Sequence, residues 1–159
     1  MRRNAVPLAL AWVACLLLAA CSSGQVRRVS EPAVNIQQLT VRTDGGWSVD
    51  LRIDNFSSVP MRFDRVTLAM TVGGQSAGTL QGQPALTIGP EAADVATLTL
   101  SPSPAARIVV ADALARGGNV NYVLEGTVDV VPEKGGSHTY SVKRSNALGP
   151  VPGLPGVMR

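Results

Sequence analysis

Alternation of apolar and polar residues with a period of two is the feature that most constrains the fold of this chain. In residues 47–54, WSVDLRID, every apolar residue from Trp47 to Ile53 is followed by a polar one. Because successive side chains of a strand point to opposite faces, this pattern places one face on a core and the other in water. Similar alternation recurs at 66–72 and 120–130. The sequence therefore predicts half-buried antiparallel strands.

Closely spaced glycines separate these runs. DGG at 44–46, GG at 73–74 and EKGGS at 133–137 each lie between two strand-like segments, as expected for hairpin turns that need positive φ angles. The predicted strands, seven in all, cover residues 35–43, 46–55, 64–73, 75–81, 94–101, 119–131 and 137–144.

One segment has helical rather than strand character. Ser103 is a good N-cap, Pro104 suits the first helical position, and Gly117 suits the end of the helix. Between them, Ile108 and Leu114 recur at helical spacing. The predicted fold class is mainly β: a seven-stranded antiparallel β-sandwich, immunoglobulin-like or fibronectin III-like, with one short helix before the long sixth strand.

The N-terminus has the layout of a secretory signal peptide. Arg2 and Arg3 precede an apolar run from Ala5 to Ala20, which is shorter than the roughly 20 residues needed to span a bilayer. We therefore predict a signal peptide over residues 1–20. Two other interpretations stay open, namely a secreted protein cut after Ala20 with a free thiol, and a retained membrane anchor.

The end of this run, Leu18-Ala19-Ala20-Cys21, resembles the lipobox of bacterial lipoproteins. The resemblance implies cleavage before Cys21 and transfer of a diacylglycerol to its thiol, which would leave the mature chain without a free thiol. Because Ser22 rather than aspartate follows, the same family implies delivery to the periplasmic face of the outer membrane. The resemblance therefore implies that the protein is bound to a membrane through its N-terminal lipid.

Composition divides the rest of the chain. Residues 21–33 mix Ser, Gly, Pro and charge and are interpreted as a lipidated tether, residues 34–144 as the folded domain, and residues 145–159 as a flexible tail rich in Pro and Gly. Without the two leader arginines, the basic residues exceed the eleven acidic ones by a single charge. With aromatic residues at 4%, no nucleic-acid partner is expected.

The chain offers little for catalysis. His138 is the only histidine, whereas metal sites need several donors. None of the loop serines Ser57, Ser58, Ser101 and Ser103 lies in a Gly-x-Ser-x-Gly elbow. Asp50 and Asp54 flank Arg52 on one predicted strand face, which is typical of a charge-balanced surface. We predict no enzymatic activity, no metal and no cofactor.

The run WSVDLRIDNFSSVPMRFDRVTLAMTVGGQSAG, residues 47–78, is similar to the type 2 late embryogenesis abundant family and its WHy domain. Asn55 matches the first asparagine of the family's Asn-Pro-Asn-like turn, while Phe56 and Ser57 replace the other two residues. The later IGPEAADVATLTL, residues 88–100, resembles the family's next strand. The resemblance covers about 34–144 and implies a folded β-sandwich associated with desiccation, cold and other stresses.

Asn55 is the one polar residue singled out as a possible site. Its structural role would be to bond nearby backbone at a strand end, and its alternative role would be contact with a ligand. The expected function is a lipid-anchored envelope protein with a stress-associated protective or binding role, toward a client that the sequence does not name. The alternative is an accessory lipoprotein subunit of an envelope assembly or transport complex.

Overall fold

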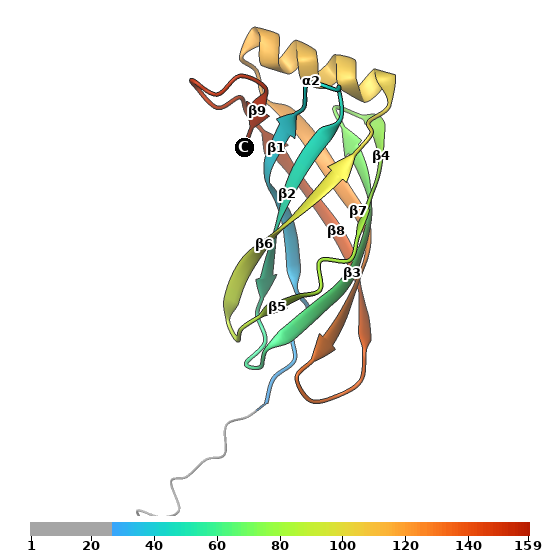
Figure 1. The fold of residues 1–159 in the computed structure, drawn as a ribbon, viewed down its shortest axis with the longest axis vertical. Helices are drawn as coiled ribbons and strands as arrows, with labels where there is room; N and C mark the ends of the chain where they lie inside the picture. Colours follow the sequence, from blue (N-terminus) through green and yellow to red (C-terminus); the bar gives the residue numbers. More distant parts are fainter. Residues whose placement is uncertain (1–26) are drawn as a thin grey trace, which may run out of the picture.

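The structure, a computed structural model, describes residues 27–159, which form nine strands and one helix (Figure 1). The elements are β1 (Ala33–Val41), β2 (Trp47–Asn55), β3 (Met61–Val72), β4 (Gln75–Gly82), β5 (Leu86–Ile88), β6 (Ala92–Leu100), α2 (Pro104–Arg116), β7 (Val120–Pro132), β8 (His138–Leu148) and β9 (Val157–Met158).

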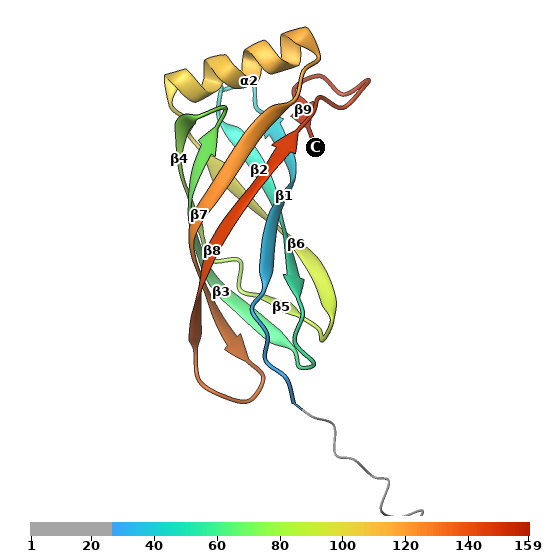
Figure 2. The same ribbon diagram turned by 180° about the vertical axis from the view of Figure 1, so that it is seen from behind.

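The strands form two antiparallel sheets. One has the order β6-β2-β1-β9, and the other has the order β4-β3-β7-β8 with β5 also paired to β3. Helix α2 lies across one end of the two sheets, and the N-terminal segment leaves from the other (Figures 1 and 2). The predicted class is confirmed as mainly β, with two antiparallel sheets and one helix. The count of seven strands is wrong, because β5 and β9 are too short to show a period.

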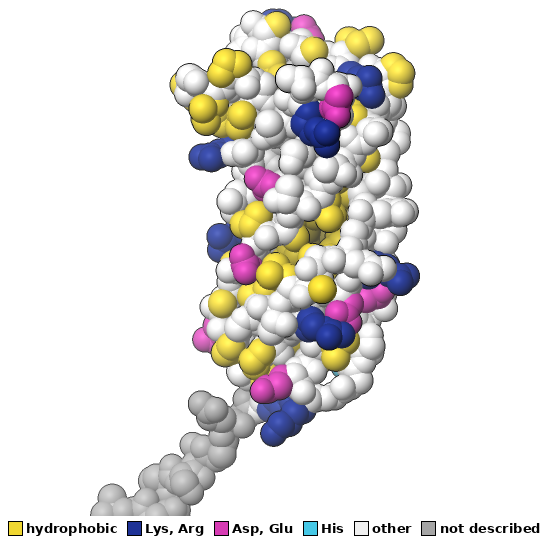
Figure 3. All heavy atoms as spheres, viewed as in Figure 1, with side chains coloured by type: hydrophobic (Ala, Val, Ile, Leu, Met, Phe, Trp, Pro, Cys, Tyr) yellow, Lys and Arg dark blue, Asp and Glu magenta, His cyan; other side chains and the backbone are white. Residues whose placement is uncertain are grey.

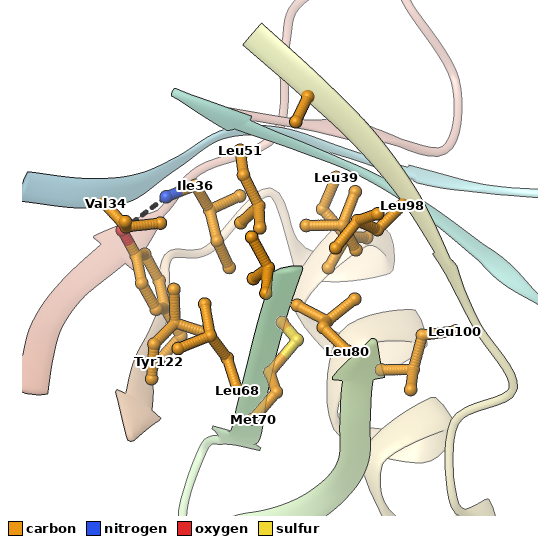
Figure 4. Packing of buried hydrophobic residues seen from close by; sticks show 14 of the residues in the cluster. Val34, Ile36, Leu39, Leu51, Leu68, Met70, Leu80, Leu98, Leu100 and Tyr122 are labelled. Carbon is orange, nitrogen blue, oxygen red and sulfur yellow. Dashed lines mark hydrogen bonds between the residues drawn. The ribbon is translucent and has the colours of Figure 1, made fainter. Parts of the chain in front are cut away.

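A single core lies between the sheets. Along β2 the apolar side chains from Trp47 to Ile53 are all buried, as the alternation predicts. Leu51 of β2 and Leu68 of β3 belong to the same cluster, and side chains from both sheets meet in it (Figure 4). Burial of this apolar surface is the main force that holds the two sheets together.

One hydrogen bond crosses the core between the sheets. The hydroxyl of Tyr122 on β7 accepts from the backbone amide of Ile36 on β1 at 3.1 Å (Figure 4). Tyr122 is almost fully buried. The amide lies next to the irregularity in β1–β2 pairing between Ile36 and Gln38. The tyrosine therefore provides a buried backbone donor with a partner from the opposite sheet.

Tyr122→Phe should lower the free energy of unfolding by about 1–3 kcal/mol, because the Ile36 amide is then left buried without an acceptor. Urea unfolding measures the loss. Tyr140→Phe is the matched control, since Tyr140 is only half-buried and its hydroxyl has no protein hydrogen bond among residues 27–159. Equal losses in the two variants would contradict the assigned role of Tyr122.

The predicted helix is confirmed together with its ends. The side chain of Ser103 accepts from the Ala106 amide at 3.2 Å, and Gly117 adopts a left-handed φ of 67° at the C-cap. The predicted apolar face is not the buried one: Ile108 is 70% exposed, whereas Ala106, Val110 and Ala113 are buried. The residues of α2 that face the sheets are small, because the helix packs closely over the ends of the two sheets.

Residues 145–159 are not an independent tail in the structure. Strand β8 continues to Leu148, and β9 pairs with β1 so that Met158 lies opposite Leu39 and is fully buried. The backbone of Arg159 also exchanges hydrogen bonds with Gly149 at 2.7 and 2.9 Å. Prolines and glycines here build the turn that returns the chain to β1, and this overturns the expectation of flexibility.

Candidate functional site

Asn55 is the last residue of β2, at the end of the domain opposite α2. The residue is only 1% exposed. Its Nδ2 donates to the carbonyl oxygens of Val59, Ile88 and Gly89 at 2.9, 3.2 and 2.8 Å. Its Oδ1 accepts from the Ser57 amide at 2.9 Å. Both ends of the amide group are therefore bonded to backbone, and the side chain joins the β2–β3 connection to the end of β5.

The two serines that follow hold the N-terminal segment. The Ser57 hydroxyl accepts from the Ser30 amide at 2.9 Å and donates to the Ser30 carbonyl at 3.3 Å. The Ser58 hydroxyl accepts from the Arg28 amide at 2.8 Å, and the Ser58 amide donates to the Arg28 carbonyl at 3.0 Å. We call residues 55–58 the docking loop, because they bind residues 28–30 to the domain.

Arginine side chains add to this contact. The Arg28 guanidinium donates to the Phe56 carbonyl at 2.9 Å and pairs with Glu91 at 3.2 Å. Because the Arg28 and Glu91 side chains are 59% and 70% exposed, the ion pair contributes little. The Arg27 side chain donates to the Lys134 carbonyl in the β7–β8 turn. Both arginines are thus held against the domain.

The docking loop has the chemistry of a clamp rather than of a reactive centre. Within residues 27–159 every buried side-chain nitrogen and oxygen has a hydrogen-bond partner. In the same range, no three His, Cys, Asp or Glu side chains group together as metal ligands. What the arrangement can do is fix the position and direction of the chain that enters the domain.

The other sequence candidates lie apart from this loop. His138 is exposed at the start of β8, with its ring 6.2 Å from that of Tyr140. Asp50 accepts from Thr97 Oγ1 at 2.7 Å, and Arg52 pairs with Asp54 at 2.9 Å on the outer side of β2.

The two aspartates are bonded to neighbouring residues of the same sheet, and His138 only contacts the ring of Tyr140. The structure does not bring His138 and the two aspartates into one site. Cys21, the predicted acylation site, lies outside the described residues.

Among residues 27–159, one titratable group, Lys143, has a clearly shifted pKa. The Glu125 carboxylate accepts a hydrogen bond from the Lys143 ammonium at 2.7 Å and, with its negative charge, raises the pKa of Lys143. The two side chains are 54% and 83% exposed, so this is a pair on the outer surface of β7 and β8. It is not the depressed pKa of a catalytic amine.

An apolar groove of about 470 Å³ opens at the α2 end of the domain. Leu114 and Ala115 of the helix form one wall, and residues 150–156 form the other. Leu154 in that second wall is 49% exposed. The groove and the docking loop therefore lie at opposite ends of the domain.

Sequence reasoning missed the docking itself. Ser57 and Ser58 were predicted only as loop residues, and residues 21–33 as a continuous tether. The partners are about thirty residues apart, and hydrogen bonds between two irregular segments leave no periodic signal. Only the position of Asn55 at the end of a strand pointed to this region.

The fold and its site define a mainly β protein with two antiparallel sheets, whose buried polar cluster clamps its own N-terminal segment. Residues 50–146 match the family model described as late embryogenesis abundant protein. Since the match spans well over half of the chain, the protein belongs to the type 2 late embryogenesis abundant family. No curated protein matched the sequence. No helix within residues 27–159 is long and apolar enough to cross a membrane.

Several solved structures are similar to the chain. A protein from Archaeoglobus fulgidus is 14% identical with a TM-score of 0.44, and the match covers 78% of this chain and 98% of that one. A structural genomics target is 16% identical (TM-score 0.47; 80% and 92% covered). A protein from Arabidopsis thaliana, solved in solution, is 9% identical (TM-score 0.47; 77% and 80% covered).

Proposed function

We propose that the protein is a lipid-anchored member of its family in the cell envelope, acylated on Cys21, with a stress-associated protective or binding role and no enzymatic activity. The observation that carries the proposal is the position of Cys21. It follows Leu18-Ala19-Ala20 at the end of an apolar run, shortly before a segment that is hydrogen-bonded to the folded domain. Because Ser22 rather than aspartate follows Cys21, the resemblance to lipoproteins supports the periplasmic face of the outer membrane as the proposed location.

Membership of the late embryogenesis abundant family supports the association with stress, since the family resemblance implies a domain associated with desiccation, cold and other stresses. The site supports a non-enzymatic role, because its polar groups bond to backbone and position a chain. A domain held at a membrane has its working surface kept close to that membrane without any further binding energy.

The mature protein should carry the mass of a chain beginning at acylated Cys21. Intact-mass measurement of protein extracted from the envelope checks this, and sucrose-gradient fractionation checks the outer-membrane assignment. A mass equal to the unmodified chain, or one that retains Met1, would show that the anchor is absent.

Survival of drying or osmotic stress tests the role. Deletion should weaken survival, and Cys21→Ala exported with an ordinary cleavable signal should fail to restore it. His138→Ala should restore it fully, because that side chain lies on an exposed strand start away from the docking loop. Rescue by the soluble form would remove tethering from the mechanism, and loss of rescue with folded His138→Ala would contradict the non-enzymatic role.

The groove between α2 and residues 150–156 favours a second candidate, an accessory subunit of an envelope assembly or transport complex. Its lining residues belong to α2 and to the segment before β9, at the opposite end of the domain from where the chain enters it (Figure 1). An accessory subunit should recover one stoichiometric partner from crosslinked cells, whereas a general protective protein should not. Leu154→Asp should abolish that recovery if the groove is the contact.

A further inference from the structure

The docking of residues 28–30 sets how far the domain can stand from its anchor. Only seven residue steps separate Cys21 from Arg28, the first residue bonded to Ser58. A chain spans at most about 3.6 Å per residue, so the free segment can reach only about 25 Å. A free tether as far as residue 33 would reach about 43 Å. The hydrogen bonds to Ser57 and Ser58 therefore shorten the maximum reach of the tether by nearly half.

That short reach fixes which end of the domain lies near the bilayer. The docking loop lies at the end from which the N-terminal trace leaves, opposite α2 and β9 (Figures 1 and 2). Strand β7, with 13 residues, runs between these ends and at about 3.3 Å per residue is roughly 43 Å long. An anchored domain therefore keeps its docking loop close to the lipid and its helix far from it.

The same end exposes apolar side chains. Phe56, in the middle of the docking loop, is 52% exposed, and Val29, between the docked Arg28 and Ser30, is 40% exposed. The loop cannot turn Phe56 inward cheaply, because the residues on both sides of it are buried and hydrogen-bonded. A rigid loop thus presents an aromatic ring at the point where the chain enters the domain.

We propose that this end of the domain rests on the bilayer, with Phe56 inserted at the boundary between head groups and acyl chains. The proposal rests on the proposed acylation of Cys21, which supplies the short tether. Phe is among the apolar side chains with which peripheral membrane segments insert about 5–10 Å into this boundary. The lipid anchor brings Phe56 to the membrane, and the ring then sets the orientation of the domain there.

The charges at this end show that the contact is not mainly electrostatic. Arg28 is paired with Glu91, and Glu133 lies beside Lys134 in the next turn. Figure 3 shows basic and acidic side chains close together at this end of the domain. A strongly basic patch would need anionic lipid. The mixed charge here predicts contact with zwitterionic lipid as well.

The test uses the full acylated chain in phosphatidylcholine vesicles that contain a lipid-borne quencher. A fluorescent reporter is attached at Lys134→Cys, near the docking loop, or at Ile108→Cys, on the 70% exposed outer face of α2. Because acylated Cys21 has no thiol, each chain carries one label. The reporter at position 134 should be quenched severalfold more than the reporter at position 108.

Two further variants test the ring itself. Phe56→Ser, combined with the reporter at position 134, should lower its quenching but leave it above that of position 108, because the ring no longer inserts while the short tether still holds this end near the lipid. The docking itself survives, since the Arg28 bond to residue 56 uses only the backbone carbonyl. Leu154→Ser, at the α2 end of the domain, is the matched control. It should leave the quenching of the reporter at position 134 unchanged. Intact mass is measured on each sample, and a chain without acyl groups would contradict the proposed anchoring.

Acylated chains with equal quenching at the two reporters, or with quenching unaffected by Phe56→Ser, would overturn the proposed contact and leave the anchoring intact.

Discussion

Asn55→Asp should lower the free energy of unfolding by at least about 3 kcal/mol. The substitution keeps the size of the side chain but replaces the Nδ2 donor with a carboxylate oxygen. That oxygen would face three backbone carbonyls at hydrogen-bonding distance, in a position only 1% exposed. The variant keeps the acceptor for the Ser57 amide but loses the three bonds donated by Nδ2, and it places a negative charge among carbonyl acceptors. Urea or thermal unfolding measures the change.

Asn146→Asp is the matched control. Asn146 is exposed on β8, and its Oδ1 accepts from the Ala147 amide at 2.9 Å, which an aspartate can also do. Its stability should stay within about 0.5 kcal/mol of the parent. If Asn55→Asp and Asn146→Asp lower the free energy of unfolding equally, the Asn55 side chain does not hold the docking loop in the way its contacts indicate.

Leu51→Asp should leave the domain unfolded at room temperature. Leu51 is fully buried in the middle of β2, among side chains of both sheets. Removing its apolar side chain costs about 2–5 kcal/mol, and burying an unpaired carboxylate adds several more. The sum is comparable to the whole stability of a small domain, about 5–15 kcal/mol. Circular dichroism and the melting transition report the loss.

Asp50→Ser, one residue earlier, is the control for register. The Asp50 side chain lies on the outer side of β2, where it accepts from Thr97 Oγ1 at 2.7 Å. Losing one exposed hydrogen bond should change stability by about 0.5 kcal/mol or less. Similar melting shifts for Leu51→Asp and Asp50→Ser would mean that the two faces of β2 are assigned the wrong way round.

The sequence was sufficient for elements whose own residues carry the signal. Strand β2 alternates because its two faces meet different surroundings, and α2 is bounded by residues that cap it locally at Ser103 and Gly117. The mainly β class, the single helix and the position of Asn55 at a strand end all follow from such local patterns.

Features that depend on a distant partner could not be predicted in this way. Gly126 interrupts the alternation of β7 without any local reason. In the structure, a Cβ at Gly126 would lie 2.1 Å from the Thr67 carbonyl oxygen, so that only glycine lets β7 approach β3 at this point. The docking of residues 28–30, the buried face of α2 and the pairing of β9 are of the same kind.

The pairing of β9 with β1 has a consequence for the order in which the protein is made. Almost the whole domain separates these two strands along the chain, so this edge of the sheet is added only after residues 157–158 have been synthesised. Contacts between such distant segments make folding slow, because a long loop must close before they form. A nascent polypeptide with this topology therefore lacks the β9 edge of its first sheet until translation is almost complete.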